Sequence, residues 1–195
     1  MIAPAHPSLS DDPAVPTCAP DTGGWIATVD PADATGELAE AYAHQDARMG
    51  RVTGITRLGS LYPALVAERL RLYDVVEATP SSIPDWAKRA VVLLVSALNG
   101  CHFCMASNTE KLVAAGHGRD AEAIAADPLG ASIDDPAVDA LLVYARRLTR
   151  EPGAVSAADL GALRAAGWSD LDILDVNNIT AYYAYINRVT AGLGL

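Results

Sequence analysis

A nine-residue apolar run in the middle of the chain, Ala90–Leu98, ends at Asn99-Gly100 and is followed at once by Cys101-His102-Phe103-Cys104. A helix formed by this run has no polar face, so it must be buried on nearly all sides, either in the centre of a domain or at a subunit interface. A second helical pattern begins at Cys101 and continues to about residue 115, where Gly116 closes it. The two cysteines are therefore expected in the first turn of a helix that directly follows a buried one.

The rest of the chain also has helical periodicity. Apolar residues recur at helical spacing in the segments 35–48, 62–78, 84–99, 101–115, 120–126, 136–149, 157–165 and 170–192. Prolines stand near several of the expected helix starts, and Asp135 and Ser156 are suitable N-caps. No segment alternates with a period of two over the length of a strand. The sequence predicts an all-α fold, with a helical domain over residues 26–195 preceded by a proline-rich arm over residues 1–25.

Composition and charge exclude several classes of function. Of the 195 residues, 51% are hydrophobic and 19% are charged, so the chain can bury a full core, but its longest apolar run is too short for a transmembrane helix. A net charge of −10 argues against binding to nucleic acid. The first 25 residues lack the basic start and apolar stretch of a signal peptide, which favours a cytoplasmic protein. A permanent disulfide is not expected in that compartment.

The spacing of Cys101 and Cys104 indicates redox chemistry. Two thiols at positions i and i+3 lie on the same face of a helix and can close a small disulfide with little backbone movement. The helix N-terminus favours the thiolate and lowers a cysteine pKa from its usual value of about 8.5. Two other interpretations stay open, namely a structural zinc site and an inert buried pair. Zinc is disfavoured because only Cys18 and four scattered histidines remain as ligands.

The last predicted helix carries amide and phenol groups among its apolar residues. These groups are suited to lining a pocket or an interface, although half-buried packing is the more common role of tyrosines on a long helix. They belong to Asn177, Asn178, Tyr182, Tyr183, Tyr185 and Asn187.

The segment from Val92 to Cys104, with Asn99-Gly100-Cys101-His102-Phe103-Cys104 at its end, resembles the core of the alkylhydroperoxidase AhpD-like branch of the carboxymuconolactone decarboxylase family. The likeness extends to Leu58-Gly59 with Pro63-Ala64-Leu65, and to the region from Ala165 to Gly194 that is similar to the closing helix of peroxidase-related members. It implies an AhpD-like helical bundle with a helical hairpin that carries the cysteine pair, assembled as a homo-oligomer. Neither a cofactor nor a metal is expected.

The resemblance also implies a reaction. In the family, the cysteine that matches Cys104 attacks a peroxide and becomes a sulfenic acid, the one that matches Cys101 condenses with it to a disulfide, and a dithiol reductant restores both. A glutamate twelve residues before the first cysteine and a histidine four residues after the second relay the proton. This chain has Arg89 and Asn108 at those positions, and an amide cannot act as a base near neutral pH.

Two explanations for the missing relay are open. Either Arg89 projects toward the thiols and stabilises a thiolate by its charge, or it points to solvent or to an acidic partner and the function has changed. His102 is a possible substitute, but it is turned about 100° around the helix from Cys101, so a surface position is favoured.

The sequence thus predicts a thiol-dependent, peroxidase-like oxidoreductase that acts on a peroxide or a small disulfide. Dithiol-disulfide exchange is the alternative activity. The alternative from another class is a non-catalytic helical oligomer that binds a small ligand or partner. Decarboxylation of a lactone is disfavoured, because that chemistry does not need redox cysteines.

Overall fold

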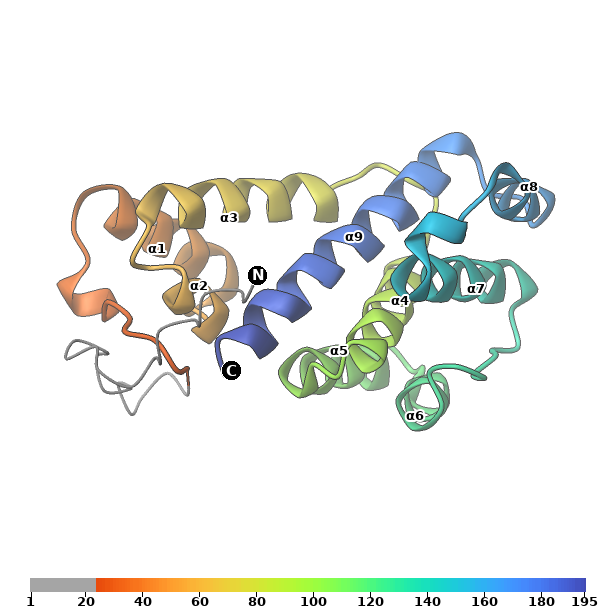
Figure 1. Cartoon of the computed structure of the whole chain (residues 1–195), viewed down its shortest axis with the longest axis horizontal. Coiled ribbons are helices and arrows are strands. Elements are labelled where there is room, and N and C mark those ends of the chain that lie inside the picture. Colours follow the sequence, from red (N-terminus) through yellow and green to blue (C-terminus); the bar gives the residue numbers. More distant parts are fainter. Residues whose placement is uncertain (1–23) are drawn as a thin grey trace, which may run out of the picture.

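The computed structural model describes residues 24–195, and every regular element in that range is a helix (Figure 1). Most of the arm that we expect at residues 1–25 lies outside the described residues, as does Cys18. The elements in chain order are η1 (Pro31–Asp33), α1 (Gly36–Met49), α2 (Gly54–Leu58), α3 (Pro63–Glu77), α4 (Asp85–Leu98), α5 (His102–Ala114), α6 (Gly118–Ala126), α7 (Pro136–Arg150), η2 (Pro152–Ala154), α8 (Ala157–Ala165) and α9 (Asp170–Gly192).

These bounds confirm the all-α prediction. Two helices begin where the sequence has a suitable N-cap residue. The Asp135 side chain accepts hydrogen bonds from the backbone N–H groups of Ala137 and Val138 and so begins α7. Ser156 begins α8 with a reciprocal capping box to Asp159. Helix α2 was not predicted, because its five residues are too few for a periodic pattern.

Helix α4 forms the centre of the molecule. It contacts α5, α6, α7 and α9, and none of the residues 90–96 is more than 1% exposed. The expectation of a helix buried on nearly all sides is therefore confirmed, and the burial occurs within a single chain. Because α4 and α5 are consecutive and pack against each other, the buried helix fixes the start of α5.

Helix α9 runs across the molecule between two groups of helices (Figure 1). It contacts α4, α7 and α8 on one side, and α2 and α3 on the other. Helices α1 and α3 pack together around a smaller apolar cluster of their own, formed by Leu38, Ala41, Tyr42, Val66 and Leu70. This arrangement lets residues of α1, α3 and α5 line one common space.

Within residues 24–195, none of the helices combines the length and the apolar character needed to cross a bilayer.

Candidate functional site

The turn between α4 and α5 places Cys101. Gly100 has a φ of 68°, in the left-handed region that favours glycine. Its N–H donates to the carbonyl of Ala97 at 3.1 Å, and the N–H of Cys101 donates to the carbonyl of Ser96 at 2.9 Å. This double hydrogen bond is the Schellman motif that commonly ends a helix. The turn at Asn99-Gly100 therefore places Cys101 at the N-cap position of α5.

The two thiols meet at the start of α5. Cys101 is 2% exposed and Cys104 is 6% exposed, and a hydrogen bond of 2.7 Å joins their sulfur atoms. That bond is the largest influence on both groups: it lowers the pKa of Cys101 to about 6 and raises the pKa of Cys104. These opposite shifts place the first negative charge on Cys101 and leave the shared proton on Cys104. The pair as a whole therefore loses one proton readily and holds the other.

Two side chains of α9 lie beside the thiols. The side-chain amide of Asn187 lowers the pKa of both thiols, and the hydroxyl of Thr190 lowers that of Cys104. Asn187 is itself held in place, because its Nδ2 donates to Ser96 Oγ at 3.3 Å and its Oδ1 accepts from Asn99 Nδ2 at 3.2 Å. The polar groups that the sequence shows on the last helix thus include one neighbour of the thiols, Asn187. Thr190 was not among them, since an isolated threonine gives no signal.

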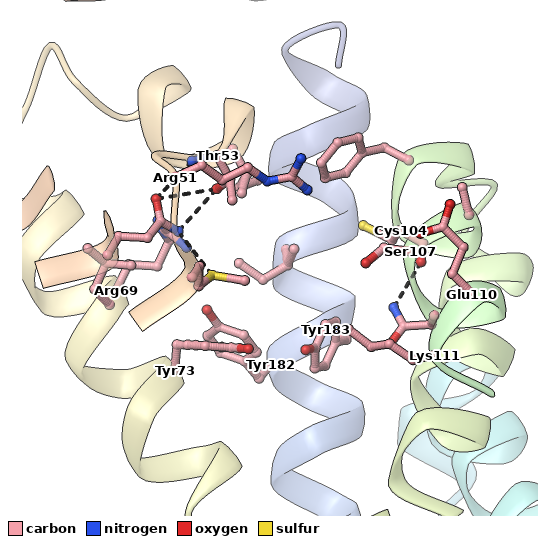
Figure 2. Close-up of a pocket in the computed structure, with 18 residues that line it drawn as sticks. Arg51, Thr53, Arg69, Tyr73, Cys104, Ser107, Glu110, Lys111, Tyr182 and Tyr183 are labelled. Carbon is pink, nitrogen blue, oxygen red and sulfur yellow. Dashed lines mark hydrogen bonds between the residues drawn. The ribbon is translucent and has the colours of Figure 1, made fainter. Parts of the chain in front are cut away.

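A cavity of about 300 Å³ opens beside Cys104 (Figure 2). Of the two cysteines, Cys104 is the one that lines it. Figure 2 shows Cys104, Ser107, Glu110 and Lys111 of α5 on one side and Arg69 and Tyr73 of α3 on the other, with Tyr182 and Tyr183 of α9 between them. Further lining residues come from α1 and from the segment around α2, and they are Gln45, Met49, Arg51, Thr53 and Ile55. A molecule in this cavity therefore meets the sulfur of Cys104 first.

Asn108 also lines the cavity, one turn after Cys104 on the same face of α5. Its Nδ2 donates to the backbone carbonyl of Cys104 at 2.8 Å. Its Oδ1 is buried and accepts no hydrogen bond from any described residue. The structure thus leaves one acceptor of Asn108 without a donor.

Arg89 does not reach the thiols. Its guanidinium forms an ion pair with Glu77 of α3 and lies 3.5 Å from the hydroxyl of Tyr183. The Tyr183 hydroxyl in turn donates to Glu77 at 3.0 Å. Of the two orientations considered from the sequence, the structure has the one toward an acidic partner. The Arg89 charge is neutralised locally, so it is not the source of a stabilised thiolate.

His102 is exposed, as the sequence favoured, and its charge has only a minor lowering effect on the pKa of Cys101. The ring of His117 stacks on the ring of Trp86, with the ring centroids 3.9 Å apart. Among the described residues, no group of three or more histidine, cysteine, aspartate or glutamate side chains is arranged to hold a metal ion.

Packing was the role favoured from the sequence for the tyrosines of the last helix, but two of them also line the cavity. Tyr182 is 6% and Tyr183 is 8% exposed, and both face the space beside Cys104. The contributions of Arg51, Arg69 and Tyr73 were missed altogether. Arg69 and Tyr73 come from α3 and Arg51 comes from the segment between α1 and α2. Neither region carries a motif, and only the tertiary packing brings these residues to the cavity beside the cysteine pair.

Comparison with solved structures identifies the fold. A peroxidase-related protein with an alkylhydroperoxidase AhpD core from Ralstonia eutropha JMP134 superposes with a TM-score of 0.78 at 21% sequence identity, over 88% of this chain and 90% of that one. A peroxidase-related protein from Silicibacter sp. TM1040 gives a TM-score of 0.73 at 19% identity, over 100% of this chain and 94% of that one. The structural neighbours are AhpD-like, and the chain has the AhpD-like helical fold that its cysteine motif predicts.

A third neighbour has a different activity. The debrominase Bmp8, whose structure contains 2,3,4-tribromopyrrole, gives a TM-score of 0.68 at 18% identity, over 85% of this chain and 87% of that one. No protein-family profile and no curated protein matches the sequence. These likenesses are consistent with the AhpD and carboxymuconolactone decarboxylase family, while the fold alone does not determine the reaction.

Proposed function

We propose that this chain is a thiol-dependent oxidoreductase that reduces a hydroperoxide at Cys104 and resolves the product with Cys101. The observation that carries the proposal is the hydrogen-bonded pair of sulfurs, 2.7 Å apart, of which one lines an open cavity. The peroxidase-related neighbours support the same class of activity.

The reaction uses the proton that the two sulfurs share. When Cys104 passes its proton to the Cys101 thiolate, Cys104 becomes the thiolate and attacks the terminal oxygen of the hydroperoxide. The O–O bond breaks, the OH group stays on the sulfur, and the alkoxide leaves as an alcohol after taking a proton from water. Cys104 is now a sulfenic acid. The Cys101 thiol attacks its sulfur, water leaves, and a disulfide forms. An external dithiol then reduces the disulfide by thiol-disulfide exchange and is itself oxidised.

The shared proton would compensate for the missing relay. Asn108 and Arg89 provide no base, since one is an amide and the other is a cation held by Glu77. A thiol pair that is already singly ionised near neutral pH does not need a separate base to generate the nucleophile. The amide of Asn187 and the hydroxyl of Thr190, both on α9, favour the same charge.

The test is peroxide consumption with dithiothreitol as reductant. We expect Cys104→Ser to abolish turnover. In the absence of dithiothreitol, Cys101→Ser should consume one equivalent of peroxide and stop, with a sulfenic acid on Cys104 that dimedone traps. His102→Ala, which changes an exposed side chain next to the pair, is the matched control and should retain full activity. Absence of turnover and of dimedone labelling, with thiols that stay unreactive in the folded protein, would support the non-catalytic alternative.

Dithiol-disulfide exchange is a second candidate because a disulfide releases a thiolate, which is a far better leaving group than an alkoxide. Among the described residues that line the cavity, no histidine stands ready to protonate an alkoxide. Reduced protein should be mixed separately with tert-butyl hydroperoxide and with oxidised dithiothreitol. A faster reaction with the disulfide would make exchange the function.

A further inference from the structure

The cavity beside Cys104 is positively charged in a chain of net charge −10. Three cationic side chains line it, Arg51, Arg69 and Lys111, against a single carboxylate, Glu110. Clefts lined by one sign of charge attract ligands of the opposite sign. The contrast with the rest of the molecule makes the cavity a site for an anion.

The two cavity arginines lack the carboxylate partners that their neighbours have. Between residues 48 and 89 the chain has six arginines, and four of them form ion pairs, Arg48 with Asp74, Arg57 with Asp30, Arg71 with Glu68 and Arg89 with Glu77. Within residues 24–195, Arg51 and Arg69 form no such pair, and Arg69 donates to the hydroxyl of Thr56 instead. Of these six arginines, the two left without a carboxylate are therefore the two that line the cavity.

The cations lie on both sides of the space. Arg69 comes from α3 and Lys111 from α5, and the side chain of Arg51 extends toward the middle of the cavity (Figure 2). Loss of water around its ammonium group lowers the pKa of Lys111, and the repulsion of Arg89 adds to this effect, while Glu77 offsets part of it. A bound anion would offset that repulsion and favour the charged form of Lys111.

The remaining wall is apolar and largely aromatic. It is formed by rings and aliphatic side chains from α1, α2, α3, α5 and α9, namely Met49, Ile55, Tyr73, Phe103, Tyr182 and Ile186. Ligand pockets span roughly 300–1,000 Å³, so a cavity of about 300 Å³ fits a small molecule. Flat, apolar groups of the ligand would pack on these rings.

An unsatisfied acceptor lies at the reactive end. Asn108 is 4% exposed, lines the cavity, and its Oδ1 has no donor among the described residues. The O–H of a hydroperoxide is a donor of the kind this oxygen lacks. Because Asn108 is one helical turn from Cys104, it would hold that group near the sulfur.

We propose that the substrate is a small organic acid with an apolar, ring-sized body: Arg51 and Arg69 bind its carboxylate, and its hydroperoxide group lies between Asn108 and Cys104. The inference rests on the proposed function for the reactive end only. The anion site follows from the charges of the cavity, whatever reaction takes place there.

Binding of an unreactive analogue tests the anion site without turnover. We expect 3-phenylpropionate to bind the reduced protein in isothermal titration calorimetry, and 3-phenylpropanol, which has the same body without the charge, to bind at least about fivefold more weakly. Arg51→Gln and Arg69→Gln should each raise the dissociation constant of the acid by about fivefold or more. Arg71→Gln, which removes a paired arginine two residues from Arg69, should change it by less than about twofold.

The competing outcomes separate the two proposals. Equal binding of acid and alcohol, or equal effects of the Arg69 and Arg71 substitutions, would overturn the carboxylate site. Tighter binding of phenyl phosphate than of 3-phenylpropionate would assign the cations to a phosphate. Binding of the acid without any peroxidase activity would overturn the proposed function and leave the anion site standing. Thermal melting of each variant checks that it is folded. Arg51→Gln is the variant expected to disturb the fold least, because Arg51 is exposed.

Discussion

At the scale of single residues, the feature that decides the chemistry is the proton shared by Cys101 and Cys104. Burial alone would raise the pKa of both thiols, because the apolar surroundings disfavour a charge. The hydrogen bond between the sulfurs overcomes this for one of them, and Asn187 adds a second donor. The reactivity of the pair therefore comes from its own geometry and from α9.

We predict that the pair loses its first proton near pH 6, where the hydrogen bond with Cys104 sets the pKa of Cys101. The thiolate is then present above about pH 6 and lost below it. Thiolate absorbance in the ultraviolet, followed against pH in a Cys18→Ser background, measures this ionisation. Cys104→Ala should raise the pKa of Cys101, because it removes the hydrogen bond from Cys104 while Cys101 stays buried.

The matched control for that titration removes the neighbouring ion pair. Glu77→Gln combined with Arg89→Gln replaces both charges at once and leaves no uncompensated buried charge. We expect the thiol titration to stay within experimental error of wild type. A rise of one pKa unit or more in the double variant would restore the hypothesis that Arg89 stabilises the thiolate.

The sequence identified Cys101, Cys104 and Asn108 as neighbours because helical spacing alone puts them on one face. It could not identify the partner of Arg89. Glu77 is twelve residues earlier on a different helix, and the contact depends on how α3 packs against the rest of the molecule. Spacing within a helix is readable from sequence, whereas a pairing across helices depends on tertiary packing.

At the scale of elements, a junction of polar contacts joins the start of α9 to α4 and to the linker before α4. Lys88 of α4 forms a buried ion pair of 2.8 Å with Asp175 of α9. Asp172 of α9 accepts from the backbone N–H of Ser82 at 2.6 Å and from the N–H of Ser169 at 2.8 Å. Since α9 lines the cavity and flanks the thiols, this junction fixes a wall of the site.

We predict that Asp172→Asn destabilises the protein at pH 7 by roughly 1–3 kcal/mol, because an amide NH₂ would face N–H and O–H donors. Burial would raise the pKa of Asp172, but the hydrogen bonds from Ser169 and Ser82 outweigh it and lower the pKa. The folded protein thus gains stability above the unfolded pKa of about 3.9, and loses it as the pH falls through the lower folded value.

Chemical denaturation at several pH values measures that loss. The difference between wild type and Asp172→Asn should be largest near pH 7 and should shrink below about pH 4. Asp170→Asn is the control, because Asp170 lies in the same first turn but is exposed and paired only with Arg164. A difference between wild type and Asp172→Asn that is independent of pH would contradict the role given to the carboxylate.

The elements themselves were largely predictable. Long helices such as α7 carry a periodic apolar pattern together with a cap such as Asp135, and both signals are local. Helix α2 has neither the length nor a side-chain cap, so its sequence gives no comparable signal.

At the scale of the whole molecule, the cavity depends on an arrangement that no local pattern records. Its walls come from α1 and α3 on one side and α5 on the other, and α9 lies between them (Figure 1). The sequence therefore predicted the reactive atoms but not the residues that select the ligand. Arg51 and Arg69 became candidates only when the packing of the first helices onto α9 was known.

The assembly of the molecule stays a prediction. Large apolar side chains remain exposed along α3, where Leu65 is 47%, Leu72 is 51% and Val75 is 70% exposed. These three residues lie on one side of the helix, since their spacings of seven and three match the helical repeat. An exposed apolar stripe of this kind is typical of a surface that another protein covers. The resemblance in sequence implies a second copy of the same chain.

We predict a mass in solution of at least twice the 20.3 kDa of one chain, measured by light scattering coupled to gel filtration. Leu72→Lys combined with Val75→Lys places two charges in the stripe and should shift the protein toward the single-chain mass while the helical content stays the same. Val143→Lys makes the same change at an apolar residue of α7 that is 53% exposed, and it should leave the mass unaltered. A wild-type mass of one chain would contradict the predicted assembly, and an unchanged mass in the double variant would move the interface away from α3.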